Sequence, residues 1–256
     1  MLSLRKALEK KDFEVVDLFT LSFSLFRHNF VNFLLVGFLC AMPTIITTIY
    51  FPPTMFDPTK MQTFKDIINW FQNEVNEGFY INLFLSWFLD IISAVSIALL
   101  VEGLIYDKIR TASYAIVKTF QMIIPILVTS IITIIIYIFG LSLFIFPGII
   151  LMILFMFTTN ICALRHTWGI DAIRYSFSLV KPKFFKSLSM LAFIVLFQNA
   201  FIITFPSAPM DTREGVLYYF LSMIILYFFD TYFKILISLY FLNRDFVTNA
   251  TLDDNI

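Results

Sequence analysis

Charged residues are scarce in this sequence. Asp, Glu, Lys and Arg make up 14% of the 256 residues, whereas a soluble domain carries about 25%. The formal net charge is zero, so the basic surface typical of nucleic-acid-binding proteins is missing. Hydrophobic residues reach 59%, and the mean hydropathy is +0.86. We therefore expect no nucleic-acid partner and a chain surrounded by a lipid bilayer.

The residue types that most often carry catalysis or bind metals are also few. The two histidines, His28 and His166, lie beside basic residues, and the two cysteines, Cys40 and Cys162, lie within apolar runs. A free cysteine in such a run behaves as a small hydrophobe. The sequence contains no His/Cys cluster, nucleophile motif or phosphate-binding loop. We expect no catalytic residue, no metal ligand and no cofactor, and hence a protein that is not an enzyme.

Long apolar runs dominate the rest of the chain. About 20 consecutive apolar residues suffice for a helix to cross a bilayer. We predict spans over residues 31–51, 79–101, 121–144, 147–164, 187–205 and 215–242. Pro43 lies inside the first span, where a proline is typical of a kink. The sequence predicts an all-α polytopic membrane protein with six transmembrane helices, forming a single integral membrane domain over residues 1–256.

Three amphipathic segments, 17–28, 108–118 and 171–183, alternate with these spans. Each combines apolar residues with Lys or Arg, a pattern typical of a helix lying in the membrane interface. Segment 17–28 has a second interpretation, as the first turns of the span that follows it. A further amphipathic helix is predicted for residues 60–77, on the outer surface. Nine basic residues are candidates for contacts with anionic lipid head groups or a protein partner: Arg27, Lys108, Arg110, Lys118, Arg165, Arg174, Lys181, Lys183 and Lys186.

The distribution of Lys and Arg predicts the orientation. Of the 18 such residues, 14 flank the spans on one side, and three, Lys60, Lys65 and Arg213, lie on the other. Segments rich in Lys and Arg stay in the cytoplasm. We therefore predict that both termini are cytoplasmic.

A motif recurs three times along the chain. Residues 22–27 (Ser-Phe-Ser-Leu-Phe-Arg) match residues 176–181 (Ser-Phe-Ser-Leu-Val-Lys), and residues 113–118 form a weaker copy. The motif predicts a threefold repeat of an interfacial helix followed by a transmembrane hairpin. The expected repeats cover residues 17–101 with an external insertion at 52–78, then 102–164, then 165–242. Such repeats build many transporters, with sites at repeat interfaces, although duplication for economy of folding explains them equally well.

Two neighbouring stretches carry a family resemblance. The run Phe146-Pro147-Gly148-Ile149-Ile150, followed by residues 169–181, resembles a broad bacterial family of six-span membrane proteins. That family includes the membrane domain fused to some glycerophosphodiester phosphodiesterases and many uncharacterised stand-alone relatives. The resemblance implies a six-span fold in the bacterial cytoplasmic membrane. It implies no activity, because no segment between the spans is long enough for the hydrolase barrel.

Polar residues inside the spans are the candidates for a binding site. Asp90, Asp230 and Lys234 are charged, and Asn160 is an amide. A charge at the centre of a span costs about 2.5–3.5 kcal/mol and therefore pairs or lines a cavity. Asp230 and Lys234 are four residues apart, on one helix face. They form either a structural ion pair or, with Asp90, a proton or substrate site, whereas Asn160 is typical of an interhelical hydrogen bond.

These observations predict a non-enzymatic multi-pass protein of the cytoplasmic membrane. Its expected role is transport, the assembly of other membrane components, or self-protection against membrane-active agents. One alternative is a scaffold that binds lipid or a partner through the basic interfacial helices. Another is a membrane-embedded enzyme acting on lipid, against which the missing catalytic residues argue. The expected partners are the lipid bilayer with its anionic head groups, another membrane protein, or a second copy of the chain.

Overall fold

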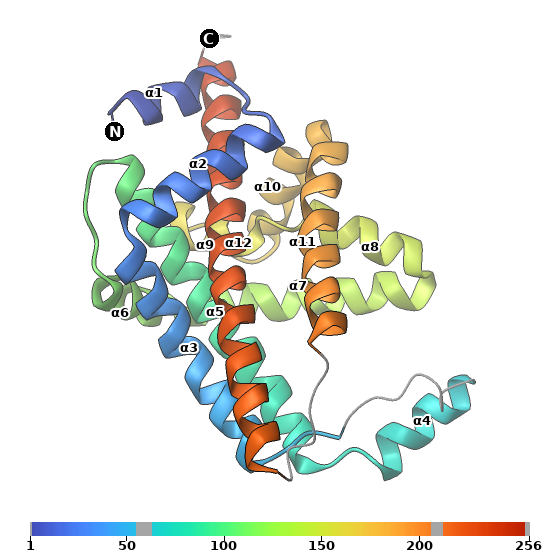
Figure 1. Ribbon diagram of the computed structural model, residues 1–256. Coiled ribbons are helices and arrows are strands. Elements are labelled where there is room, and N and C mark those ends of the chain that lie inside the picture. The colour runs from blue at the N-terminus through green and yellow to red at the C-terminus, as the bar shows by residue number, and fades with distance from the viewer. Residues whose placement is uncertain (1, 55–62, 206–211, 254–256) are drawn as a thin grey trace.

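The fold is all-helical. The structure is a computed structural model that describes residues 2–54, 63–205 and 212–253, and no strand occurs among them. Six helical segments are long and apolar enough to cross a membrane, which confirms the prediction of an all-α, multi-pass membrane protein. The span-forming helices are α3 (Phe30–Tyr50), α5 (Glu77–Ile105), α7 (Ile123–Leu143), α8 (Ile145–Leu154) with α9 (Thr158–Arg165), α11 (Phe184–Thr204) and α12 (Arg213–Asp253). Both ends of the chain lie at one end of the molecule (Figure 1).

Shorter helices precede three of these spans. Helices α2 (Val15–His28), α6 (Ala112–Gln121) and α10 (Ile170–Val180) end close before α3, α7 and α11, and a 3-10 turn, η1 (Lys181–Lys183), completes the last link. The amphipathic segments are therefore helical. Residues 108–111 are an exception, because the Thr111 side chain accepts a hydrogen bond from the Tyr114 N–H and caps α6. Their position on the inner leaflet and the threefold repeat stay predictions.

Two more short helices complete the described chain. Helix α1 (Leu2–Lys10) occupies what the sequence suggests is a polar lead. Helix α4 (Phe64–Asn73) lies within the predicted segment 60–77, of which residues 60–62 fall outside the described part. Thr63 caps α4 through a reciprocal hydrogen-bond pair with Asp66. The amphipathic pattern thus predicts the helix, and the cap determines where it begins.

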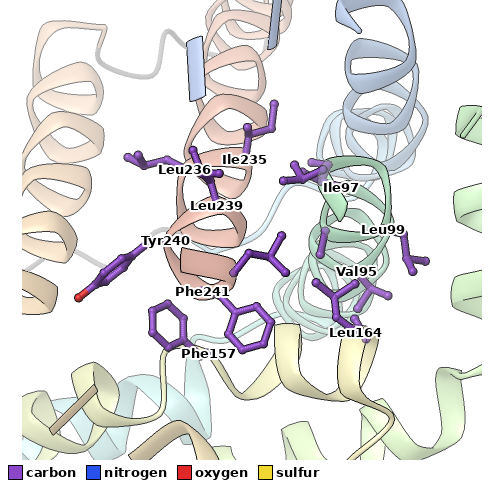
Figure 2. Packing of buried hydrophobic residues seen from close by; sticks show 14 of the residues in the cluster. Val95, Ile97, Leu99, Phe157, Leu164, Ile235, Leu236, Leu239, Tyr240 and Phe241 are labelled. Carbon is purple, nitrogen blue, oxygen red and sulfur yellow. The ribbon is translucent and has the colours of Figure 1, made fainter. Parts of the chain in front are cut away.

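The core lies between α5 and α12. Helix α12 packs on α1, α2, α3 and α5, and so joins the C-terminal part of the chain to its N-terminal half. Val95 and Ile97 of α5 and Leu239 and Phe241 of α12 are fully buried (Figure 2). Removing such side chains from contact with lipid or water lets them interdigitate at the density of a protein interior. Helices α5 and α12 are therefore packed tightly against each other.

Helix α12 is longer than predicted. We expect the last span to end at Leu242 and a polar tail to follow, but the helix continues without a break to Asp253. The prediction is wrong because the polar residues Asn243, Arg244 and Asp245 are buried, at 0%, 5% and 0% exposure. Each of them has hydrogen-bonding partners on other helices, so the helix need not end where the apolar run ends.

The fourth span is broken. The predicted continuous helix over 147–164 is wrong at residues 155–157, where α8 stops and α9 has not begun. Ser176 of α10 satisfies both sides of the break: its hydroxyl donates to Leu154 O at 2.9 Å and accepts from Phe157 N at 3.2 Å. Within a bilayer, freed backbone groups need such partners. The Phe157 ring packs on Tyr240 of α12, with ring centroids 5.1 Å apart (Figure 2).

Helices α7 and α8 pack against each other with a minimal connection. Only Phe144 separates them, and Pro147 lies in the first turn of α8, where a proline is tolerated. Gly148 permits the close approach, because a Cβ there would lie 2.4 Å from Leu141 Cδ2. In the view of Figure 1, the two helices run across the others and extend to one side. Their exposed surface is almost entirely apolar, as lipid contact requires.

Candidate intramembrane site

Three charged side chains meet between α5 and α12. Lys234 Nζ lies 2.6 Å from Asp90 Oδ1 and 2.6 Å from Asp230 Oδ2. Asp230 and Lys234 are one turn apart on α12, as their spacing predicts, whereas Asp90 comes from α5. The structure therefore brings together all three charged residues that the sequence places inside the spans. We call Asp90, Asp230 and Lys234 the charged triad.

The three members of the charged triad differ in exposure. The Lys234 side chain is 11% exposed and that of Asp230 is 23%, whereas that of Asp90 is 63%. With all three groups ionised, two carboxylates face one ammonium, so the triad carries one excess negative charge. An unpaired charge at this depth is costly. A proton or a cation at the exposed carboxylate, Asp90, removes that excess.

Two cavities adjoin the charged triad. The larger holds about 380 Å³ and the smaller about 220 Å³. Both are lined by all three triad residues and by Gln198 of α11. The larger is also lined by Cys40, Thr44, Ser86, Ser93 and Tyr227, and the smaller by Thr159, Asn160 and Ser238. Their volumes and polar linings suit water.

Asn160 is the least satisfied polar residue of this region. It is 4% exposed, lines the smaller cavity, and its Nδ2 has no hydrogen-bond partner. The expectation of an interhelical hydrogen bond is therefore wrong for this atom. A buried amide without a partner costs about 1–3 kcal/mol. Such a group is explained if water or a ligand occupies the cavity that it lines.

A network of ion pairs joins several helices at the end of the bundle that carries both termini. Arg165 of α9 contacts Asp245 of α12 at 2.5 Å and Glu102 of α5 at 3.2 Å. Arg110 binds the other oxygen of Glu102 at 3.1 Å. The Tyr175 hydroxyl donates to Asp245 Oδ1 at 2.5 Å. Helices α5, α9, α10 and α12 are thus joined through two carboxylates.

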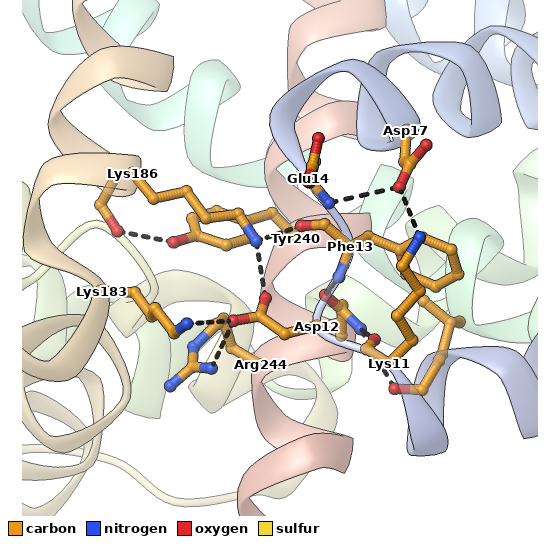
Figure 3. A network of polar contacts seen from close by, with 12 residues as sticks. Lys11, Asp12, Phe13, Glu14, Asp17, Lys183, Lys186, Tyr240 and Arg244 are labelled. Atoms are coloured by element: carbon orange, nitrogen blue, oxygen red, sulfur yellow. Dashed lines mark hydrogen bonds and ion pairs between the residues drawn. The ribbon is translucent and has the colours of Figure 1, made fainter.

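Asp12 is the centre of a second network (Figure 3). Its carboxylate lies 2.6 Å from Lys186 Nζ, 2.9 Å from Lys183 Nζ and 3.4 Å from Arg244 Nη1. Partial burial by itself raises the pKa of Asp12, but the hydrogen bonds from Lys186 and Lys183 outweigh it, and the pKa is lowered from 3.8. Asn243, beside Arg244, accepts from Phe13 N and donates to Leu8 O and Lys11 O. The loop after α1 is therefore fixed to the end of α12.

The nine basic candidates for interfacial contacts fall into two sets. Five are exposed: Arg27, Lys108, Arg174, Lys181 and Lys183. Of these, Arg174 makes an exposed ion pair with Asp171. Lys183 pairs with Asp12, and the other four, Arg110, Lys118, Arg165 and Lys186, are partly buried and bound to polar partners within the chain. The sequence predictions missed those partners, Glu102, Asp245 and Asp12, because nothing in their neighbourhood marks them.

The described residues contain no group of His, Cys, Asp and Glu that could hold a metal ion. Cys40 and Cys162 are free and buried. Cys40 lines the larger cavity of the charged triad, and Cys162 lines a third cavity beside the break in the fourth span. These two thiols therefore mark two different parts of the interior.

The fold and these contacts define a multi-pass membrane protein with a charged cavity between its helices. Compared with known proteins, the chain matches no protein-family model, no curated protein and no solved structure. The family resemblance accordingly stays a prediction.

Proposed function

We propose that this protein is a non-enzymatic transport protein of the bacterial cytoplasmic membrane, and that it carries protons through Asp90. The observation that supports the proposal is the bridge from Lys234 to carboxylates on two helices, at the wall of two cavities. Ionisable groups at membrane depth that face a cavity are typical of proton relays. A purely structural pair needs neither the second carboxylate nor the cavities.

The contacts of Lys234 give a mechanism. Its bond to Asp230 joins neighbouring turns of one helix, whereas its bond to Asp90 joins α12 to α5. A proton on Asp90 neutralises the excess charge of the triad and weakens the Asp90–Lys234 ion pair. Lys234 then stays paired with Asp230. Proton binding to Asp90 is thereby coupled to the ion pair that joins α5 to α12. A transporter must break and re-form such a contact between spans when it changes conformation.

The orientation is part of the proposal. The excess of Lys and Arg beside the spans supports a cytoplasmic location of both termini. The two ion-pair networks around Glu102, Asp245 and Asp12 then lie on the cytoplasmic side. A closed network on one side and a cavity deep in the bundle fit a resting state that is shut toward the cytoplasm.

A second candidate function is an anionic-lipid or partner-binding scaffold. Five of the nine basic candidates are exposed; of these, Arg27 lies in α2, just before α3, and Lys181 and Lys183 lie in η1, just before α11. Each basic residue near an anionic surface contributes about 1 kcal/mol. We rank this function second, because it leaves the charged triad and its cavities without a role.

Proton flux in proteoliposomes tests the primary proposal. The purified protein is reconstituted in vesicles that enclose a pH-sensitive dye, and a potassium diffusion potential drives proton uptake. We expect the wild type to acidify the vesicles faster than protein-free vesicles do, and Asp90→Asn to abolish the difference. Asp171→Asn is the matched control, because Asp171 is exposed on α10, away from the cavities.

Two outcomes would overturn the proposal. One is a wild-type flux equal to that of protein-free vesicles. The other is a normal flux in Asp90→Asn when folding, checked by size-exclusion chromatography, is also normal. Replacing external choline by sodium at constant pH is a further arm. A signal that needs sodium would show that the carried ion is not a proton.

A further inference from the structure

The larger cavity of the charged triad is roomier than the transfer of a proton requires. Its volume of about 380 Å³ lies within the range of about 300–1,000 Å³ that is typical of small-molecule sites. Its lining residues on α5 run from Leu83 to Ser93, and α5 begins at the end of the molecule remote from both termini (Figure 1). The cavity therefore extends from the middle of the bundle toward that end, in agreement with the proposed state that is shut toward the cytoplasm.

The wall of this cavity is amphipathic. Its apolar and aromatic side chains come from two helices: Leu83, Trp87 and Leu89 from α5, and Met223, Leu226 and Tyr227 from α12. The charged triad, several hydroxyl groups and the amide of Gln198 supply the polar part. Binding sites for small molecules are built in this way, with an apolar lining and a few convergent polar groups. The wall thus suits a solute with an apolar body and one polar group.

The charge of the triad determines the sign of that polar group. With Asp90 ionised, the triad carries one excess negative charge, which a cation can neutralise as well as a proton can. Asp90 is also the accessible member, since its side chain is 63% exposed although Oδ1 lies 2.6 Å from Lys234 Nζ. The rings of Trp87 and Tyr227 also line the cavity, and aromatic rings attract a cation within about 6 Å of their centres. An anionic solute would instead meet two carboxylates.

An organic cation suits this cavity better than a metal ion does. Protein sites for metal ions gather several carboxylate, imidazole or thiolate ligands, and the part of the chain that the structure describes contains no such group of three or more. An organic ammonium or phosphonium ion needs one counter-charge and an apolar surface around it. Asp90 supplies the counter-charge, and the walls formed by α5 and α12 supply the surface.

We infer that the larger cavity binds a monovalent organic cation with an apolar or aromatic body, and that this cation takes the place of the proton on Asp90. The inference rests on the proposed function, because it names a second ligand of the carboxylate that carries the proton. When the cation enters, the carboxyl O–H bond of Asp90 breaks, a water molecule in the cavity accepts the proton, and the carboxylate pairs with the cation. One positive charge leaves Asp90 and one arrives, so the net charge of the occupied site is unchanged.

Proton and cation therefore compete for Asp90, and binding of the cation depends on pH. The neutral amides Gln198 of α11 and Asn160 of α9 line the cavities beside Asp90. The titratable groups that line them with it come from α12 and α3: Lys234, Asp230, Tyr227 and Cys40. Lys234 and Asp230 pair with each other, so the competition is decided at Asp90.

Tetraphenylphosphonium is a direct probe of this site in the purified protein. It is a permanent cation with four phenyl rings, and tetraphenylborate is its anionic counterpart of the same shape. Equilibrium dialysis in detergent, with protein-free micelles as the blank, measures the binding of both ions. We expect tetraphenylphosphonium to bind roughly tenfold more tightly than tetraphenylborate, because of the excess negative charge. In the pH range where Asp90 is protonated, its Kd should rise roughly tenfold for each unit by which the pH falls.

Proton release gives a second readout. A pH indicator in weak buffer should report protons released when tetraphenylphosphonium binds in that pH range. Asp90→Asn, with normal folding checked by size-exclusion chromatography, should lower the affinity for tetraphenylphosphonium to that for tetraphenylborate and abolish the release.

The aromatic wall is tested by a separate variant. Trp87→Leu keeps an apolar side chain in the cavity but removes the ring, and we expect it to weaken the binding of tetraphenylphosphonium roughly fivefold. Trp168→Leu is the matched control, because Trp168 is exposed and lines neither cavity of the charged triad. Its affinity should equal that of the wild type.

The outcomes separate this site from the transport function. The inference is overturned if folded Asp90→Asn binds tetraphenylphosphonium as the wild type does, if tetraphenylborate binds equally well, or if binding is independent of pH and releases no proton. Loss of binding when sodium replaces choline would also overturn it, in favour of a metal cation. In each case an Asp90-dependent proton flux, measured without any organic cation, would leave the transport function standing. Binding with the expected properties but without such a flux would support the cation site and reject the transport function.

Discussion

Arg165 Nη2 lies 2.5 Å from Asp245 Oδ2, so one ion pair joins α9 to α12 across 80 residues of sequence. The Asp245 side chain is 1% exposed and that of Arg165 is 23%. Replacing Asp245 by Asn leaves a partly buried guanidinium with Glu102 as its remaining carboxylate partner. We expect the free energy of unfolding to fall by about 3 kcal/mol, measured by denaturant titration in mild detergent. Asp171→Asn, which removes an exposed pair, should leave it unchanged, and equal effects of the two variants would contradict this explanation.

The first serine of the repeated motif should contribute differently to stability in its two copies, Ser22 on α2 and Ser176 on α10. Ser176→Ala leaves Leu154 O and Phe157 N without the hydroxyl that satisfies them, and we expect a loss of about 1–3 kcal/mol. Ser22 is equally buried, but its hydroxyl has no partner, so Ser22→Ala should be neutral or stabilising. Thermal unfolding of both variants in the same detergent provides the comparison. A larger loss in Ser22→Ala would show that the break does not depend on Ser176.

Within the charged triad, the ammonium should matter more than either carboxylate. Asp230→Asn leaves Lys234 paired with Asp90, whereas Lys234→Met leaves two carboxylates without a cation. We therefore expect Lys234→Met to lower the yield of folded protein further than Asp230→Asn does. Combining Lys234→Met with Asp90→Asn and Asp230→Asn should restore the yield, because replacing a whole buried ion pair can be neutral. Fluorescence-detected size-exclusion chromatography measures this, and a triple variant as poor as Lys234→Met would refute it.

The stability contributed by Asp12 should depend on pH. Its pKa in the folded protein lies below 3.8, so its ion pairs are fully formed above that value and are lost as the pH falls through the folded-state pKa. Asp12→Asn should therefore be less stable than the wild type at neutral pH. The difference should shrink only below pH 3.8. Unfolding followed at several pH values checks this, and a difference that disappears already between pH 7 and pH 5 would contradict the role given to Asp12.

Exposed positions allow a clean test of orientation. Lys65, Arg213, Lys108 and Lys181 are all exposed, so a cysteine at each is accessible to a reagent on its own side. In a background without the native cysteines, we expect an impermeant maleimide to label positions 65 and 213 in intact cells. Positions 108 and 181 should be labelled only after lysis. Labelling of position 181 in sealed cells would reverse the topology.

Hydropathy predicts the spans well, because an apolar run and a membrane-crossing helix are nearly the same physical object. The spacing of Asp230 and Lys234 likewise predicts their contact, and the depth of Asp90 brings it near them. The break at residues 155–157 could not be predicted. Met156 and Phe157 are as apolar as their neighbours, no glycine or proline marks the site, and the stabilising group, Ser176, lies on another helix.

The extension of α12 was missed for a related reason. Asn243, Arg244 and Asp245 are polar, and a polar triplet after an apolar run is typical of a span end. Their burial depends on carbonyls and charges supplied by distant segments, which a single local stretch does not contain. The sequence shows that such groups need partners, but it does not show which helix provides them.

The contacts of Asn243 have a consequence for biosynthesis. Its side chain bonds to Leu8 O, Lys11 O and Phe13 N, so these residues are held by one that is translated at least 230 residues later. During translation the loop after α1 lacks its hydrogen bonds to Asn243 until α12 has left the ribosome. Until then, water at the membrane surface must satisfy its backbone groups. Completion of the last span is thus the event that locks the first helix in place.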